Sequence, residues 1–478
     1  MLCLNFVRVN PTLKNLQRYI RKTICLCIMT KKILSIFALG LIIFSFCSCK
    51  KTENKPLENG RFLSFCTIIR YHQIEITREK SLGWSEVEMH SVEKAKIFRE
   101  KIYKACPTAK ITWAFSWLAL TDKTARYSDI RKYVAQCVKK YGDEMTFIPG
   151  AYFPNAYNSI EQVNKDMHDA LKIIEECVGN GYRPKAIIAG FLSSKNQKYL
   201  AEKEGIHVCQ GNIFSQYAID NQDGDGSPCY PYYPSIEHFC KPAQNDSDFV
   251  DCVNLDGWTV DFLAGRREGF AEGFNSRMGV GPIETVHKFM RKGDKQAGIK
   301  KGLDQMMHTT ATHFDTGFKL NGFAWIVNCW EHALPLEGLE EWISMIMKRW
   351  PDTKIITHGE FGMLWREQFK HNDFDYKFIQ TGSGIDGSDA DKVLHWYMNK
   401  DFRLAILKQA DGKDEGKVID FTRYDKPAQE PTTMTRKWSL LGDINQKQTR
   451  PQDKPVKISE LPRESQEIIK KRYPELIK

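Results

Sequence analysis

Between residues 61 and 365 the chain alternates short apolar runs with longer amphipathic stretches. The runs have the length of buried strands, and the stretches repeat apolar residues with a helical period, as Ile160, Val163, Met167 and Leu171 do. This alternation predicts a mostly parallel sheet covered by helices. The predicted strands are residues 62–69, 111–120, 145–152, 186–192, 208–214, 249–253, 323–329 and 355–357.

The pattern changes after Trp365. Residues 393–398, 402–409 and 417–422 alternate apolar and polar positions with a period of two, which predicts a small antiparallel β-module. Three strands have too little core to fold alone, so we expect the module to pack on the preceding body. About eight strands in this order favour a closed barrel over an open Rossmann sheet. The predicted fold class is α/β, an irregular (β/α)7-8 barrel with a small C-terminal antiparallel β-module.

The amino terminus has the features of an export signal. Lys31 and Lys32 follow Met29 and precede the apolar run 33–46, which is short for a membrane-spanning helix. The next residues, Phe46-Cys47-Ser48-Cys49, resemble the lipobox of bacterial lipoproteins. That resemblance implies a working start at Met29 and lipidation at Cys49, with an uncleaved anchor helix as the alternative. We expect a lipid-anchored protein of the cell envelope, on the periplasmic side or the outer-membrane surface, whose only membrane contact is this anchor.

The predicted domain plan follows from these patterns. Residues 1–49 form the export signal, 50–60 a tether, 61–370 the barrel, 371–425 the β-module and 426–478 an extended tail with a short terminal helix.

Composition and charge exclude several classes of function. The 478 residues are 42% hydrophobic and 27% charged, as in ordinary globular proteins. Seven of the 69 Lys and Arg residues lie in residues 1–49, which hold no Asp or Glu, so 62 basic and 59 acidic residues remain. This near-neutral body does not support nucleic-acid binding. No GxGxxG follows a predicted strand and no Walker loop occurs, so nucleotide binding has no support either.

Nine of the 14 cysteines follow Cys49, and the absence of a CxxC pair among them argues against a zinc ribbon. Cys229 and Cys240 flank a loop-like stretch. They are candidates for a disulfide bond in an oxidising compartment, with two buried free thiols as the alternative.

Candidate chemistry follows from the barrel prediction, because barrel active sites lie at the carboxyl ends of the strands. Glu331 and Glu360 follow the last two strands directly, and Asp256 is an alternative partner. A glycosidase needs two such carboxyl groups, one protonated and one ionised. Each of these residues could instead be a helix cap, an ion-pair partner or part of the core. The residues expected to bind substrate are Trp113, Trp117, Tyr152, His72, Trp258, Trp330, His332 and His358.

A second candidate site lies in the segment 220–233. Asn221, Asp223 and Asp225 match the opening of a calcium-binding loop, but Tyr232 stands where the bidentate Glu belongs. A turn-rich loop with clustered tyrosines is the alternative interpretation. Apart from this candidate Ca²⁺ site, we expect no cofactor.

Residues 142–235, which include GDEMTFIPGAYFPNAY and RPKAIIAGFLSSKNQKYLAEKEGIHVCQGNIF, resemble the glycoside hydrolase/deacetylase superfamily of irregular (β/α) barrels. Residues 61–424 as a whole resemble a family of gut-bacterial lipoproteins with this barrel and a small C-terminal β-domain, which brings no established activity. The resemblance implies the fold and a glycan as partner. The Asp-Asp pair and the His-x-x-x-His motif of polysaccharide deacetylases are absent from IIRYHQIE and PGAYFPNAY, so their metal site is not carried over.

Three functions remain open from the sequence. The first is hydrolysis of a glycosidic bond by paired carboxylates at the barrel mouth. The second is noncatalytic glycan binding on the same barrel. The third is a metal-dependent carbohydrate hydrolase or deacetylase with altered ligands such as His72, Asp256 and His358.

Overall fold

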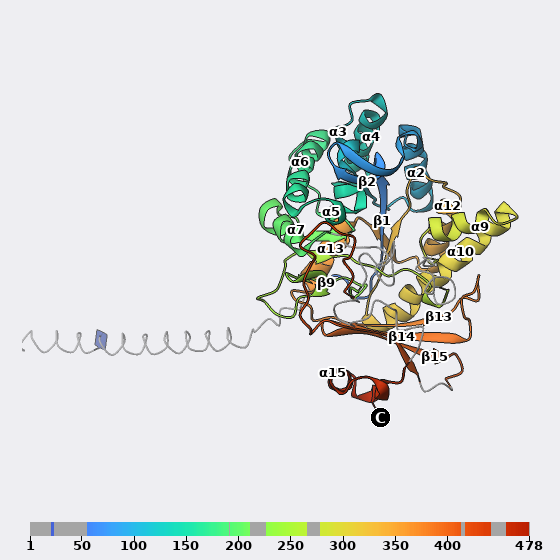
Figure 1. The fold of residues 1–478 in the computed structure, drawn as a ribbon. Helices are drawn as coiled ribbons and strands as arrows, with labels where there is room; N and C mark the ends of the chain where they lie inside the picture. Colours follow the sequence, from blue (N-terminus) through green and yellow to red (C-terminus); the bar gives the residue numbers. More distant parts are fainter. Residues whose placement is uncertain are drawn as a thin grey trace, which may run out of the picture. The chain divides into compact units, whose positions relative to one another are not determined.

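The computed structural model describes residues 21–22, 55–190, 192–210, 226–264, 278–412, 416–440 and 456–477. The chain divides into two compact units, Met1–Asn54 and Lys55–Lys478. Arg21 and Lys22, both helical, are the described residues of the first unit, and all other described elements belong to the second (Figure 1). Within the described ranges, no helix combines the length and apolar character needed to cross a membrane.

Among the described residues of the second unit, eight parallel strands form two sheets. In the larger sheet β1 pairs with β11 on one side. On its other side β1 pairs with β12 over its first residues and with β4 over its last residues. β4 in turn pairs with β5. The smaller sheet has the order β10-β7-β6. The strands are β1 (Arg61–Ile69), β4 (Thr112–Phe115), β5 (Glu144–Phe147), β6 (Ala186–Ile188), β7 (Val208–Gln210), β10 (Val253–Asn254), β11 (Ala324–Cys329) and β12 (Thr353–Ile356).

The α/β class is confirmed, whereas a closed barrel is not. Hydrogen-bond ladders between the described residues keep the five-stranded and three-stranded sheets separate.

Helices and short turns of helix alternate with these strands along the chain (Figure 1). The α-helices are α2 (Val92–Ala105), α3 (Trp117–Thr121), α4 (Ala125–Tyr141), α5 (Pro154–Tyr157), α6 (Ile160–Val178), α7 (Ser194–Tyr199), α9 (Lys288–Met290), α10 (Lys295–Ala311), α11 (Phe318–Asn321), α12 (Leu339–Arg349), α13 (His358–Gln368) and α15 (Arg463–Arg472). The 3-10 or π turns are η1 (Val87–Met89), η2 (Pro149–Tyr152), η3 (Leu200–Glu204), η4 (Ile283–His287), η5 (Thr312–Gly317), η7 (Ile458–Glu460) and η8 (Pro474–Leu476).

Local sequence accounts for the long helix α6. The Ser159 side chain accepts a hydrogen bond from the backbone N–H of Gln162 and caps the helix start. Val163, Met167 and Ile174 form its buried face, at the spacing that the sequence predicted. The helix ends at Gly179, whose φ of 82° suits glycine.

The central strand β1 is buried on both faces, as is usual in parallel sheets. On one face Phe65 packs against Phe98 of α2 and Trp342 of α12, with ring centroids 6.0 and 6.4 Å apart. On the other face Phe62 packs against Phe361 of α13, at 5.5 Å. We call this second face of the larger sheet the inner face. Helix α13 therefore covers the inner face near the start of β1.

The C-terminal antiparallel sheet is confirmed, with one strand more than the sequence predicted. Its order is β13 (Asp375–Thr381), β14 (Lys392–Asn399), β15 (Phe402–Gln409) and β16 (Lys417–Arg423). It packs on the α/β body, because the Tyr376 hydroxyl donates to the Pro231 carbonyl at 3.0 Å and Gln380 donates to the Val260 carbonyl at 3.1 Å. Ile469 of α15 packs against the outer apolar residues of this sheet.

Several local features differ from the sequence prediction. The strand expected over residues 111–120 ends at Phe115, because the Ser116 side chain caps α3. The strands expected over residues 145–152 and 186–192 end at Phe147 and Ile188, and β10 starts at the last residue of the run 249–253. Two antiparallel pairs were not predicted, β2 (His72–Thr77) with β3 (Lys80–Ser85) and β8 (Pro234–Ser235) with β9 (His238–Pro242). Cys229 and Cys240 are both buried, and the structure does not join them in the candidate disulfide.

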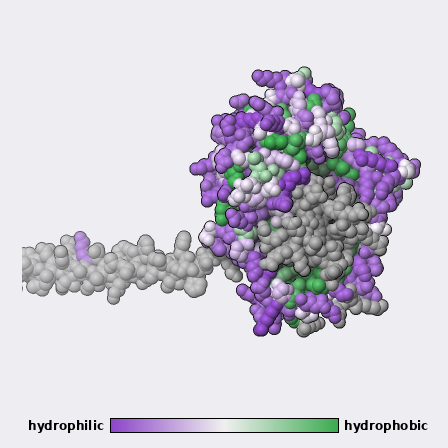
Figure 2. All heavy atoms as spheres, in the orientation of Figure 1, coloured by the Kyte–Doolittle hydropathy of each residue, from purple (hydrophilic) through white to green (hydrophobic). Residues whose placement is uncertain are grey.

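The described surface is mainly polar. Figure 2 shows mainly hydrophilic side chains on the described part of one face, with smaller apolar areas among them. Trp84 and Met434 are the most exposed large apolar side chains of the described residues, at 62% and 64%.

Candidate functional site

An ion-pair cluster joins the carboxyl ends of β1 and β11. Arg70 follows β1, and its Nε and Nη2 donate to the two carboxylate oxygens of Glu86, both at 2.8 Å. Its Nη2 also lies 3.4 Å from Glu331 Oε2, and Glu331 follows β11. The side chains of Arg70 and Glu331 are 11% and 14% exposed, so both are largely buried yet reachable. Together with Glu284 of η4, these residues are called the Arg70 cluster below.

The Arg70 cluster sets the protonation of Glu331. Burial raises the pKa of the Glu331 carboxyl above its usual range, and the positive charge of Arg70 only partly offsets this effect. The negative charges of Glu86 and Glu284 raise the pKa further. A raised pKa favours the protonated form of the carboxyl group, which is the form that a general acid needs.

A strained turn places Tyr152 at the carboxyl end of β5. Gly150, Ala151 and Tyr152 have φ values of 61°, 50° and 98° in succession. Such backbone angles cost energy for residues with a side chain and are often found at functional sites. Gly190 keeps space for this turn, because a Cβ there would lie 2.2 Å from the Tyr152 carbonyl oxygen. Tyr152 packs against the apolar cluster of Ile68, Ala114, Ile148 and Ile188.

His72 and Trp117 lie near the carboxyl ends of β1 and β4, as the sequence predicted. His72 begins β2, is half-buried, and stacks on Tyr71 with ring centroids 5.5 Å apart. Trp117 is half-buried in α3, and the guanidinium of Arg78 lies 3.7 Å from its ring centroid. The Trp117 ring therefore already has a stacking partner on one face.

Four predicted ligand-binding residues lie in the core instead. Trp113, Trp258, Trp330 and His332 are all fully buried. The Trp113 indole donates to Asp143 at 3.0 Å and the Trp330 indole to the Pro335 carbonyl at 3.0 Å, while Trp258 packs on Trp396 with centroids 5.6 Å apart. A side chain without exposed surface cannot stack on a sugar ring, so the structure places these residues outside the site.

The contacts and the pKa of His332 are also those of a buried side chain. Its Nδ1 lies 3.1 Å from Thr67 Oγ1 and its Nε2 lies 3.3 Å from Nδ1 of His90. Burial lowers the pKa of His332 to about 3, so the ring is neutral at physiological pH. It cannot present a positive charge to a ligand.

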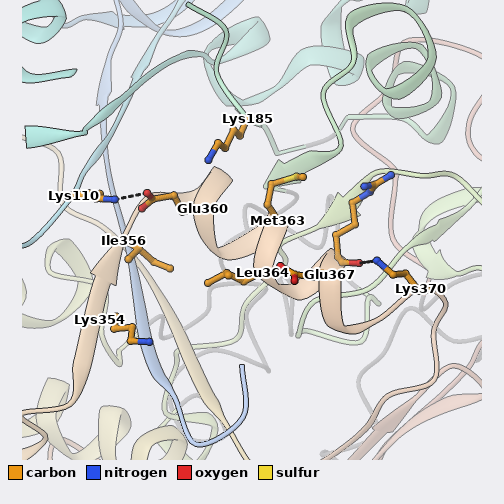
Figure 3. Close-up of a pocket in the computed structure, with 10 residues that line it drawn as sticks. Lys110, Lys185, Lys354, Ile356, Glu360, Met363, Leu364, Glu367 and Lys370 are labelled. Carbon is orange, nitrogen blue, oxygen red and sulfur yellow. Dashed lines mark hydrogen bonds and ion pairs between the residues drawn. The ribbon is translucent and has the colours of Figure 1, made fainter. Parts of the chain in front are cut away.

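Glu360 and His358 follow the carboxyl end of β12, which reaches less far along β1 than the carboxyl end of β11 does. Among the described residues β12 pairs with Arg61–Ser64 of β1, so α13 starts at the level where β4 and β5 begin. Glu360 forms an ion pair with Lys110, which precedes β4, in a groove also lined by Lys185 and Lys354 (Figure 3). The structure thus places Glu331 and Glu360 in separate ion pairs and does not bring them together.

Asp256 follows β10 of the smaller sheet. It is fully buried, and its electrostatic neighbours include Cys209 and Tyr232. Asn221, Asp223, Asp225 and Cys49 lie outside the described residues. In the described part of the chain, no three His, Cys, Asp or Glu side chains are arranged to hold a metal ion, so His72, Asp256 and His358 do not form such a group by themselves.

Sequence reasoning missed Glu86 and Glu284. Glu86 reaches Arg70 because the β2–β3 hairpin returns the chain to the end of β1, where the backbone N–H of Glu86 donates to the Tyr71 carbonyl at 3.0 Å. Recognising a hairpin in residues 72–85 would have indicated that Glu86 lies near the end of β1. Glu284 lies at the start of the helical stretch η4 to α9, and no strand end or motif in the sequence marked it as a site residue.

Two family models match the chain. DUF3863, described as a domain of unknown function with a solved structure, matches residues 55–398, and DUF3864, with the same description, matches residues 403–476. A "putative glycoside hydrolase/deacetylase" from Parabacteroides distasonis is 47% identical and covers 89% of this chain and 100% of its own, with a TM-score of 0.81. No curated protein matches the sequence.

Other solved structures are much less similar. A "probable Polysaccharide deacetylase" from Pseudomonas aeruginosa PAO1 is 13% identical, with 67% of this chain and 98% of its own covered and a TM-score of 0.38. A GH57-type branching enzyme from Pyrococcus horikoshii is 12% identical, with 63% and 70% covered and a TM-score of 0.37. At these TM-scores neither supports a conclusion about this chain.

Proposed function

The chain belongs to the DUF3863 family and is 47% identical to the Parabacteroides distasonis protein, and we propose on this ground that it is a carbohydrate-acting enzyme. The resemblance to glycoside hydrolase/deacetylase proteins is confirmed at 47% identity. The proposed reaction is hydrolysis of a glycosidic bond at the carboxyl ends of the parallel strands.

The position of Glu331 carries this proposal, because Glu331 follows β11, lies against Arg70 and has a pKa that burial raises. Glycoside hydrolysis needs a protonated carboxyl group beside the leaving oxygen and an ionised one across the bond. Glu331 is largely buried and retains a 14% exposed side chain, which suits the proton donor. Arg70 holds the Glu331 carboxylate in position and stabilises the negative charge that remains on it after proton transfer.

Glu284 is the proposed second carboxylate. It lies near enough to raise the pKa of Glu331, and it is half-buried. Glu86 is the other acidic neighbour, but both of its oxygens accept hydrogen bonds from Arg70 and its side chain is only 3% exposed. Glu86 is therefore a positioning residue that holds Arg70.

Oligosaccharide turnover tests the proposal. The purified protein is incubated with neutral and acidic oligosaccharides, and both new reducing ends and released acetate are measured. We expect new reducing ends without acetate. Acetate release alone would indicate a deacetylase, and saturable binding without turnover would indicate a glycan-binding protein; either result overturns the hydrolytic proposal.

The pH profile should respond to Glu86. The proton donor works in its protonated form, so turnover falls as the pH rises through the pKa of Glu331. Glu86→Gln removes a negative charge and leaves Arg70 to act on Glu331, and both effects lower that pKa. The alkaline limb of kcat/KM should move to lower pH. Glu88→Gln, which changes an 85%-exposed side chain two residues away, should leave it in place. An alkaline limb that stays or moves upward in Glu86→Gln contradicts this assignment.

We also propose that the protein is a lipid-anchored protein of the cell envelope. The order of basic residues, apolar run and Ser48-Cys49 supports this location. Expressed in a Gram-negative host, the protein should incorporate labelled palmitate. Cys49→Ala should abolish the label and Cys47→Ala should retain it. Label that persists in Cys49→Ala would rule out this attachment site. The candidate calcium loop at Asn221, Asp223 and Asp225 stays a prediction.

A further inference from the structure

Two thiols lie side by side beneath the Arg70 cluster. Cys66 of β1 and Cys329 of β11 are partners in the parallel register, and their side chains hydrogen-bond to each other. Cys66 is fully buried, whereas Cys329 is half-buried. Neighbouring strands lie about 4.8 Å apart, which falls within the roughly 4.4–6.8 Å range of Cα separations that disulfide bonds span.

The two sulfurs have different surroundings. Cys329 interacts electrostatically with Arg70 and Glu331 and packs against the apolar cluster that holds Tyr152. Cys66 faces His358, whose Nδ1 lies 3.3 Å from Thr112 Oγ1. A polar path therefore leads from the Arg70 cluster through both thiols to the imidazole of His358.

The pair shares one proton. Burial alone would raise the pKa of the Cys66 thiol, but the hydrogen bond from Cys329 and the neighbouring His358 outweigh it and lower the pKa to about 6. The pKa of Cys329 is correspondingly raised, chiefly by its hydrogen bond to Cys66. A thiolate is the reactive form of cysteine, and passing the shared proton from Cys329 to Cys66 places the negative charge on the half-buried sulfur.

We propose that Cys66 and Cys329 are a reversible redox pair that closes a disulfide bond when a hydroperoxide reaches the Arg70 cluster. The Cys329 thiolate attacks one peroxide oxygen, the O–O bond breaks, and a sulfenic acid and hydroxide form. The hydroxide takes the proton of Cys66 and leaves as water, and the Cys66 thiolate attacks Sγ of Cys329. The S–S bond forms, the S–O bond breaks, and the departing hydroxide takes a proton from solvent. One proton from the thiol pair and one from solvent thus turn hydrogen peroxide into two waters while the thiols become one disulfide. A small dithiol reverses the step by exchange.

Closing this bond would also alter Glu331. The negative charge of the Cys66 thiolate helps to raise the pKa of Glu331, so removing that charge lowers the fraction of Glu331 that carries a proton. Oxidation should therefore reduce turnover on the alkaline limb of the pH profile, and reduction should restore it. This consequence rests on the proposed function, whereas the disulfide itself does not.

Peptide mapping of the intact full-length protein tests the bond without any activity assay. The folded protein is treated with hydrogen peroxide, free thiols are alkylated, and peptides are analysed by mass spectrometry. We expect a Cys66–Cys329 linked peptide about 2 Da lighter than the two reduced peptides, near-complete loss of both alkylated forms, and their recovery after dithiothreitol. Met434, at 64% exposure, reports whether the oxidant acted.

The same peptide mapping is applied to cysteine variants. Cys66→Ala and Cys329→Ala should each abolish the linked peptide, and Cys106→Ala, another buried thiol, should leave it unchanged. Oxidised Met434 with both thiols still alkylated, a link from Cys329 to a different cysteine, or Cys329 sulfinic acid without a link would each overturn the proposal. The peptide map of the wild-type protein tests the proposed disulfide bond even if a variant misfolds. A linked protein without glycan turnover would refute only the proposed function.

Discussion

Glu331→Gln is expected to lower the turnover of an oligosaccharide substrate by about 10²–10⁴-fold, the usual contribution of a general acid. The amide has the shape of the carboxyl group and still offers an oxygen to Arg70, which approaches Glu331 at 3.4 Å. It cannot supply the proton that the leaving oxygen needs. Substrate binding should change little, so kcat falls while KM stays close to that of the wild type.

Glu360→Gln is the matched control for this variant. Glu360 is paired with Lys110 in the groove of Figure 3, at the amino ends of β4 and β5. Its loss should leave kcat within a few-fold of the wild-type value. Equal losses in both variants, or full turnover in Glu331→Gln, would contradict the assignment of Glu331 as proton donor.

The apolar runs located the central strands, because the same burial that requires apolar side chains also places these segments inside the sheet. β1 and β11 occupy the runs predicted at residues 62–69 and 323–329 almost to the residue, and β14, β15 and β16 match the period-two segments. A run buried on both faces, however, does not indicate which face each side chain takes. All four residues of β4 are buried, so the pattern could not tell whether Trp113 would face a ligand or the helices.

The position of Glu360 shows what local patterns omit. Glu331 and Glu360 each follow an apolar strand, and the rule that barrel sites lie at carboxyl ends treats them alike. The difference lies in register. β11 pairs with β1 over Arg61–Cys66, whereas β12 pairs over Arg61–Ser64 and then gives way to β4. Register depends on long-range packing, so residues 353–360 alone could not predict it.

The Trp113 indole donates to Asp143, and Asp143 also forms a buried ion pair with Arg99. Because both charges are buried, we expect this ion pair to be important for stability. Asp143 accepts hydrogen bonds from Arg99 Nε at 2.9 Å, from the backbone N–H of Ile111 at 3.1 Å and from the Trp113 indole at 3.0 Å. The side chains of Arg99 and Asp143 are 1% and 0% exposed. One carboxylate thus ties α2 and β4 to the residue that precedes β5.

Asp143→Ala is expected to lower the free energy of unfolding by about 3–5 kcal/mol, because it leaves the Arg99 charge buried without its partner. Arg99 would keep only its hydrogen bond to the Ala109 carbonyl and its place over the Tyr141 ring, and neither compensates a full charge. Asp129→Ala, which breaks an exposed pair with Lys132, should change stability little. Denaturant unfolding followed by tryptophan fluorescence measures both. A midpoint for Asp143→Ala equal to that of Asp129→Ala would show that this pair does not stabilise the fold.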